Sequence, residues 1–203
     1  MNFAEQCNTI FHRAVRDYHI TDNVNAPAPN PYTTNSVEHD LYKKNWIDTV
    51  QWHLEDIIRD PHINPAEALE VKRRIDRSNQ DRTDLVERID TYFLEQFQNV
   101  KPQPDAKLNT ESPAWAIDRL SILHVKLWHM REQTERRDAD AEHLSRCRAK
   151  LHVLEEQLDD LTKAINELLD DYEQGTRVMK VYRQMKMYND PTLNPVLYKT
   201  DNK

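Results

Sequence analysis

Two side chains in the segment Leu41–Phe97 are of types, and at a spacing, that could do chemistry. His53 and Asp56 are three residues apart, so on a helix they lie on one face. A carboxylate that orients an imidazole is what a general acid–base pair requires. The same arrangement is also common on ordinary helix surfaces. The first interpretation makes His53 and Asp56 candidate catalytic residues, and the second gives them no chemical role.

A second group of polar side chains lies in the run Asp76–Asp84, which contains no apolar residue. We call this run the polar belt, because it interrupts an otherwise amphipathic helix. Ser78 and Arg82 occupy positions where the apolar stripe calls for leucine, and Asn79 lies beside them. The polar belt is therefore either a buried hydrogen-bond network or a binding site.

The partner of Arg82 decides between these two uses of the polar belt. If the hairpin closes near residues 62–63, Arg82 lies opposite Lys43 and close to Asp40. An Asp40–Arg82 ion pair that fixes the register of the two helices is the preferred interpretation. In the alternative, the guanidinium is held ready for a carboxylate or phosphate, and Ser78, Asn79, Arg82 and Lys43 bind an anionic small molecule.

The elements that position these residues are predicted to be helices. Ten prolines divide the chain, and the intervals between them show helical periodicity. The chain has one glycine, Gly175, where ordinary usage gives about 14, which disfavours sheets and excludes glycine-rich phosphate loops. We expect one all-α domain, an antiparallel bundle of five or six helices. It comprises a helical hairpin at 36–99, a second antiparallel pair at 113–174, and a C-terminal basic helix and tail at 176–203.

The first proline-free interval carries the candidate metal ligands of the N-terminal region. His12 and His19 share one side of the expected helix with Glu5 behind them. A solvated helix face is the preferred interpretation. The His-Glu-x-x-His motif and the paired Glu-x-x-His motif of di-iron bundles are both absent from the sequence. The sequence therefore predicts no metal site and no cofactor.

The long helix near the C-terminus has the clearest periodicity. Its apolar residues repeat every seven positions, as Leu144, Leu151, Leu158, Ile165 and Tyr172 and as Cys147, Leu154, Leu161 and Leu168. We call these nine residues the heptad seam. It can close within the chain against the helix that begins at Pro113, or against a second subunit or protein partner.

Charge and composition limit the partners. A net charge of −7 gives no general attraction to nucleic acid or anionic membranes. No apolar run approaches the ~20 residues that span a bilayer, and no signal peptide is visible, so a cytoplasmic protein is expected. The basic and aromatic segment 180–188 follows an acidic run, and intramolecular docking is its preferred use. Cys7 and Cys147 are expected to be reduced and buried.

Four separated motifs resemble a bacterial family of unknown function. The motifs are Trp52-His53-x-Glu55-Asp56, Ile75-Asp76-x-x-Asn79-Gln80-x-Arg82, Ile117-Asp118-Arg119-Leu120-Ser121-Ile122-Leu123 and Lys186-Met187-Tyr188-Asn189-Asp190-Pro191. The resemblance extends over residues 41–198. It implies an all-helical protein, encoded near envelope-polysaccharide glycosyltransferases, and it carries no catalytic roles.

Two functions are consistent with these observations. The first is a non-enzymatic helical binding or scaffold protein associated with envelope glycan synthesis. The alternative is a small hydrolase or transferase that acts on a phosphorylated or sugar-nucleotide substrate, with His53 and Asp56 as the acid–base pair. A pocket at the polar belt with a perturbed His53 favours the second, whereas a filled belt and an exposed apolar groove favour the first.

Overall fold

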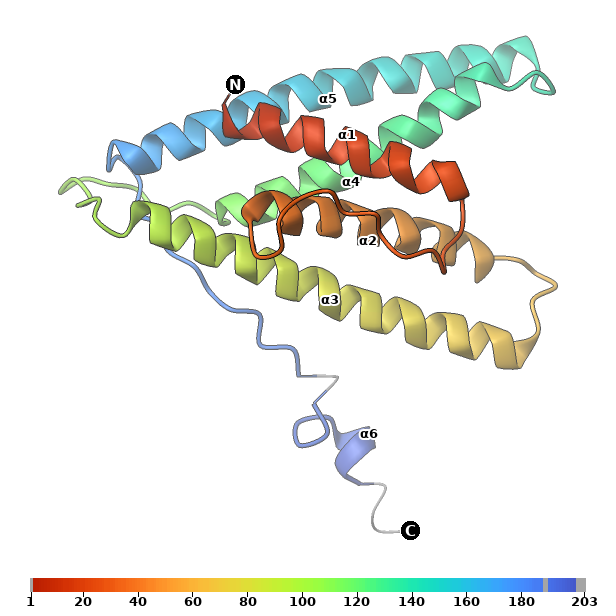
Figure 1. Ribbon diagram of the computed structural model, residues 1–203, viewed down its shortest axis with the longest axis horizontal. Helices are drawn as coiled ribbons and strands as arrows, with labels where there is room; N and C mark the ends of the chain where they lie inside the picture. Colours follow the sequence, from red (N-terminus) through yellow and green to blue (C-terminus); the bar gives the residue numbers. More distant parts are fainter. Residues whose placement is uncertain (1, 188–189, 200–203) are drawn as a thin grey trace.

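The computed structural model describes residues 2–187 and 190–199, and in this part of the chain the protein is an all-α bundle (Figure 1). Six helices follow one another: α1 (Phe3–Thr21), α2 (Val37–Ile57), α3 (Pro65–Phe97), α4 (Pro113–Glu135), α5 (Ala141–Glu173) and α6 (Pro195–Tyr198). The predicted fold class is confirmed. Within the described residues, no helix combines the length and apolar character that a membrane span requires.

Two antiparallel hairpins make up most of the bundle. In the first, α3 begins at Pro65, and the Asn64 side chain accepts a hydrogen bond from the Ala66 amide at 2.9 Å. In the second, the chain turns at 136–140, and Asp140 caps α5 by accepting from the His143 amide at 2.7 Å. Residues 113–174 therefore form a hairpin and not one long helix.

Helix α1 lies between α5 and α2 and also packs against α4 (Figure 1). Its apolar residues, three and four apart, put one continuous stripe into the centre of the bundle. Phe11, Ala14 and Tyr18 on this stripe are buried and belong to the main core cluster. The last turn of α1 therefore lies close to both α2 and α4, which positions the candidate site.

The expected helix in the segment that follows Gly175 is wrong for residues 176–187, which form no helix. The chain turns at Gly175, and the Val178 amide then donates to the Lys107 carbonyl at 3.0 Å. Arg183 pairs with Glu87 of α3 at 2.9 Å. These bonds to neighbouring elements replace those of a helix. The basic residues do dock within the molecule: Arg183 and Lys186 contact α3, whereas Arg177 pairs with Asp171 of the acidic run of α5 at 2.8 Å. Positions 188–189 and 200–203 lie outside the described residues.

The heptad seam runs along the side of α5 that packs against α4 and α1. Cys147, Ile165 and Tyr172 are buried, while the leucines of the seam are half-buried. Both Cys147 and Cys7 are free and buried, as predicted. The seam closes in part within the chain, and a second subunit on its remaining surface stays a prediction.

Candidate metal centre

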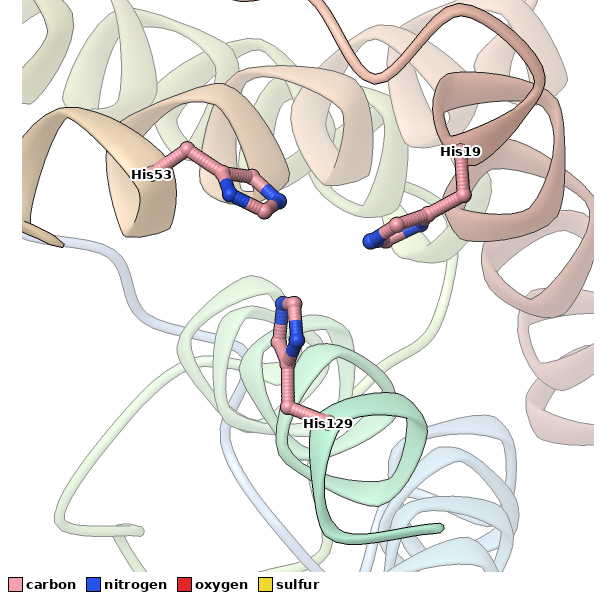
Figure 2. Close-up of side chains that lie close together, drawn as sticks. All are labelled: His19, His53 and His129. Carbon is pink, nitrogen blue, oxygen red and sulfur yellow. The ribbon is translucent and has the colours of Figure 1, made fainter. Parts of the chain in front are cut away.

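Three histidines from three helices converge near one end of α1 (Figure 2). His19 comes from the last turn of α1, His53 from α2 and His129 from α4. One ring nitrogen of each lies within 4.8 Å of the others, and all three residues are half-buried. The three Nε2 atoms are buried without a hydrogen-bond partner. We call this group the histidine cluster.

The other ring nitrogen of two of these histidines has a partner outside the cluster. His19 Nδ1 lies 2.7 Å from the Val15 carbonyl oxygen, and His129 Nδ1 lies 2.8 Å from Glu132 Oε2. Both partners only accept, so each Nδ1 carries the proton and donates it. In the neutral form of such a ring, Nε2 presents a lone pair to the cluster. This is how metal-bound histidines are commonly oriented by their outer partners.

Aromatic rings hold the three imidazoles in place. Each ring has a stacked partner: Tyr18 on His53 with centroids 5.0 Å apart, Trp128 on His19 at 4.5 Å, and Trp52 on His129 at 4.9 Å. Trp128 is itself fixed, because its Nε1 donates to Glu132 Oε1 at 3.1 Å. The ring planes are thus set by packing, so little side-chain entropy remains to be lost when a ligand binds.

Burial favours the neutral forms of His19 and His53. Desolvation lowers the pKa of His19 and of His53, and the neighbouring His129 lowers both further. The carboxylate of Asp22 acts in the opposite direction on both pKa values. Neutral imidazole is the form that binds metal ions.

The spacing of the three nitrogens suits a transition-metal ion. Three points no more than 4.8 Å apart lie at most about 2.8 Å from a common centre. A Zn–N bond measures about 2.0–2.1 Å, so shifts of about 0.7 Å or less bring all three nitrogens to bonding distance. Rotation of the imidazoles about their side-chain bonds can supply movements of this size.

His53 and Asp56 do not act as a pair in this structure. His53 stacks on Tyr18 and faces the other two histidines of the cluster. The carboxylate that it approaches is that of Asp22, with Oδ1 3.8 Å from Nε2. Asp56 is exposed and contributes only a weak upward effect on the pKa of His53. No hydrogen bond or ion pair joins these two side chains among the described contacts. Their use as an acid–base pair stays a prediction.

Asp56 instead lines a cleft of about 340 Å³ between α2, α3 and α4. Trp52 and Arg59 of α2, Arg82 of α3 and Ile122 of α4 also line it. The cleft therefore combines an indole face and two guanidinium groups with apolar walls. Trp52 separates the cleft from the histidine cluster, because its ring also stacks on His129.

The proposed Asp40–Arg82 ion pair is wrong. Arg82 pairs with Asp48 of α2, Nε to Oδ1 at 2.6 Å, and with Asp118 of α4, Nη2 to Oδ1 at 3.2 Å. Asp40 pairs with Arg88 at 3.1 Å, one to two turns further along α3. Burial lowers the pKa of Arg82, but the two carboxylates outweigh it, so the net change is upward. The part of the interpretation that holds is that Arg82 is engaged in ion pairs.

The position of Lys43 opposite Arg82 is also wrong, because Asp48 of α2 takes that place. Lys43 is exposed, whereas the side chain of Lys44 is fully buried and contacts both Asp48 and Asp118, the latter at 2.8 Å. Ser121 Oγ donates to Asp48 Oδ2 at 2.6 Å. We call Lys44, Asp48, Arg82 and Asp118 the ion-pair network.

Ser78 and Asn79 complete the polar belt through one residue of α2. Ser78 Oγ donates to Gln51 Oε1 at 3.0 Å, and Gln51 Nε2 donates to Asn79 Oδ1 at 2.9 Å. The belt is thus largely filled by side chains of the protein itself. Of the four residues predicted to bind an anion, only Arg82 lines the cleft.

Residues 38–181 match the family described as Protein of unknown function (DUF4254). Because this stretch covers more than half of the chain, the protein belongs to that family. No curated protein and no solved structure gives a significant match. Membership of this family assigns no activity to the protein.

Sequence reasoning missed the histidine cluster, because its members lie on three different helices. His12, the other candidate in the first helix, is exposed and does not take part. A signal was nevertheless present: each cluster histidine directly follows an aromatic residue, as Tyr18-His19, Trp52-His53 and Trp128-His129. In the structure, these aromatic residues supply the three stacked rings.

Proposed function

We propose that this protein binds one divalent transition-metal ion through His19, His53 and His129. The observation that carries the proposal is the convergence of three buried Nε2 atoms without hydrogen-bond partners. Burying an acceptor that has no partner is unfavourable by about 1–3 kcal/mol. A metal ion at the centre would satisfy all three nitrogens together.

The donor set selects the class of metal. Imidazole nitrogen suits Zn²⁺, Co²⁺, Ni²⁺ and Cu²⁺, whereas Mg²⁺ and Ca²⁺ prefer oxygen ligands. The ion would join α1, α2 and α4, which lie far apart in the sequence. Because the site does not exist in the unfolded chain, an ion at 100 times its dissociation constant would stabilise the fold by about 2.7 kcal/mol.

Titration of the metal-free protein with Zn²⁺ tests this proposal. We expect binding of one ion per chain by calorimetry and a rise in melting temperature. The variant His129→Asn should lose at least most of that rise. The matched control is His12→Ala, which removes an exposed histidine of α1 and should bind like the wild type. A wild type that binds Zn²⁺ no better than His129→Asn would contradict the proposal.

A second candidate function is the binding of a sugar nucleotide in the cleft beside Trp52. The cleft offers an indole face for a planar base and the Arg59 guanidinium for a phosphate. Binding of a sugar nucleotide would connect the protein to glycan synthesis, as the family resemblance implies, and this connection stays a prediction. UDP-glucose should raise the melting temperature of the wild type but not of Trp52→Leu or Arg59→Met. No rise in the wild type would remove this candidate.

A further inference from the structure

Asp22 is the first residue after α1 and has a backbone conformation unusual for a residue other than glycine. Its φ and ψ are both 45°, in the left-handed region, and its amide donates to the Tyr18 carbonyl at 3.0 Å. Aspartate tolerates this region better than most residues. The turn leaves the carboxylate beside the histidine cluster, with Oδ1 3.8 Å from His53 Nε2.

The two carboxylates nearest the histidine cluster have different environments. Glu132 is committed to orienting other groups, because it accepts from Trp128 Nε1 and from His129 Nδ1. Among the described contacts, the Asp22 carboxylate has only its 3.8 Å approach to His53, and its side chain is 65% exposed. Asp22 is therefore free to bind an ion without breaking another bond.

We propose that Asp22 is the fourth ligand of the metal ion, on the solvent side of the three histidines. The inference rests on the proposed function and adds to it. Donors of a tetrahedral zinc centre lie about 3.3 Å apart, so the distance from Asp22 to His53 has to shorten by about 0.5 Å. For the Asp22 carboxylate to come close to His19 and His129 as well, the turn after α1 has to move.

The segment that follows Asp22 is attached to a rigid helix. Arg74 of α3 donates to the Val24 carbonyl and to Asn25 Oδ1, the latter at 2.7 Å. The movement that brings Asp22 onto the ion is thus confined to a short stretch between the end of α1 and Val24. Such a short, anchored connection favours one defined position of the carboxylate over many.

A fourth protein ligand changes what the site can do. Four protein donors leave no position for water or substrate, as in structural zinc sites, whereas three leave one open, as in catalytic sites. With Asp22 bound, the ion would hold α1, α2 and α4 together and would not act as a catalyst. The exposure of Asp22 would also let the ion enter and leave from the solvent side.

Co²⁺ loaded into the metal-free full-length protein distinguishes these states by its visible absorption. With four protein ligands, added azide should leave the spectrum of the wild type unchanged. In Asp22→Asn and Asp22→Gly, both of which accept the left-handed backbone, water replaces the carboxylate. Their Co²⁺ affinity should then fall at least about tenfold, and azide should shift their spectra. Asp60→Asn, which alters an exposed aspartate in the connection between α2 and α3, is the control and should behave like the wild type.

These measurements distinguish a failure of the Asp22 inference from a failure of the proposed three-histidine site. If the wild type binds Co²⁺ but azide shifts its spectrum, or if both Asp22 variants bind as tightly as the wild type, Asp22 is not a ligand and the three-histidine function stands. If the wild type binds no Co²⁺, both the proposed function and this inference are overturned.

Discussion

Arg82 of α3 and Asp118 of α4 form an ion pair across the bundle, with Nη2 3.2 Å from Oδ1. The same carboxylate oxygen lies 2.8 Å from Lys44 Nζ of α2. Together with Asp48, the ion-pair network contains two cations and two anions. Each charge has at least two partners of opposite sign, which is the condition under which buried charges are tolerated. The network thereby fixes how three helices meet.

Replacing Arg82 with methionine should cost about 3–5 kcal/mol of unfolding free energy, because it leaves two carboxylates to one lysine. Adding Asp118→Asn should restore much of this loss, since it returns the network to one cation and one anion. Chemical denaturation measures all three stabilities.

The control for this rescue is Asp40→Asn. Asp40 pairs with Arg88 and not with Arg82, so the change should not rescue Arg82→Met. Rescue by Asp40→Asn, or a single Arg82→Met variant as stable as the wild type, would contradict the observed network.

Two adjacent lysines of α2 should respond in opposite ways to the same substitution. Lys44→Met should destabilise the protein by about 3–5 kcal/mol, because the fully buried ammonium neutralises Asp48 and Asp118. Lys43→Met removes an exposed charge and should change stability by no more than about 0.5 kcal/mol. Thermal and denaturant melts of the two variants give the comparison. Equal losses of stability would contradict the burial of Lys44 and the exposure of Lys43.

The helices could be predicted from the sequence because their signals are local. Asn64-Pro65 begins α3, Asp140 begins α5 and Gly175 follows its end, each through bonds within a few residues. The seven-residue repeat likewise identified the face of α5 that packs. Such signals need no knowledge of where other helices lie.

The pairing between helices could not be predicted with the same accuracy. The helical part of α2 ends at Ile57, and seven residues connect it to α3. This longer and asymmetric connection brings Asp48 and Gln51, and not Asp40 and Lys43, opposite the polar belt. The histidine cluster depends further on how α1 and α4 pack on α2. No spacing within a single helix contains that information.

Gly175→Ala should destabilise the protein by about 1–3 kcal/mol. Gly175 has φ of 71°, and a Cβ there would lie 2.8 Å from the Lys101 carbonyl oxygen. The control is Gln174→Ala, which alters the exposed residue before it, in the right-handed region, and should cost less than about 0.5 kcal/mol. A Gly175→Ala variant that melts with the wild type would show that the turn after α5 tolerates a side chain.

The unfolding free energy of the metal-free protein should decrease as the pH is lowered, and part of this decrease should come from His124. This residue is 8% exposed, its ring packs edge-on against Phe11, and its Nε2 lies 3.0 Å from Asn8 Oδ1. Desolvation lowers its pKa to about 3, and the charges of His12 and Arg131 add to this. The folded protein therefore keeps His124 neutral at a pH where the unfolded chain protonates it.

The direction of the effect follows from proton uptake. Below the unfolded pKa of about 6.5, the unfolded state binds one more proton at this site, so stability falls as pH decreases toward about 3. The slope approaches about 1.4 kcal/mol per pH unit, which amounts to about 2 kcal/mol between pH 6.5 and 4.5. His124→Asn lacks this dependence but shares every other titrating group. The wild type's advantage in unfolding free energy over His124→Asn should therefore shrink by about 2 kcal/mol across that range. If the difference in unfolding free energy between the two proteins did not change with pH, His124 would bind its proton equally well in the folded and unfolded states.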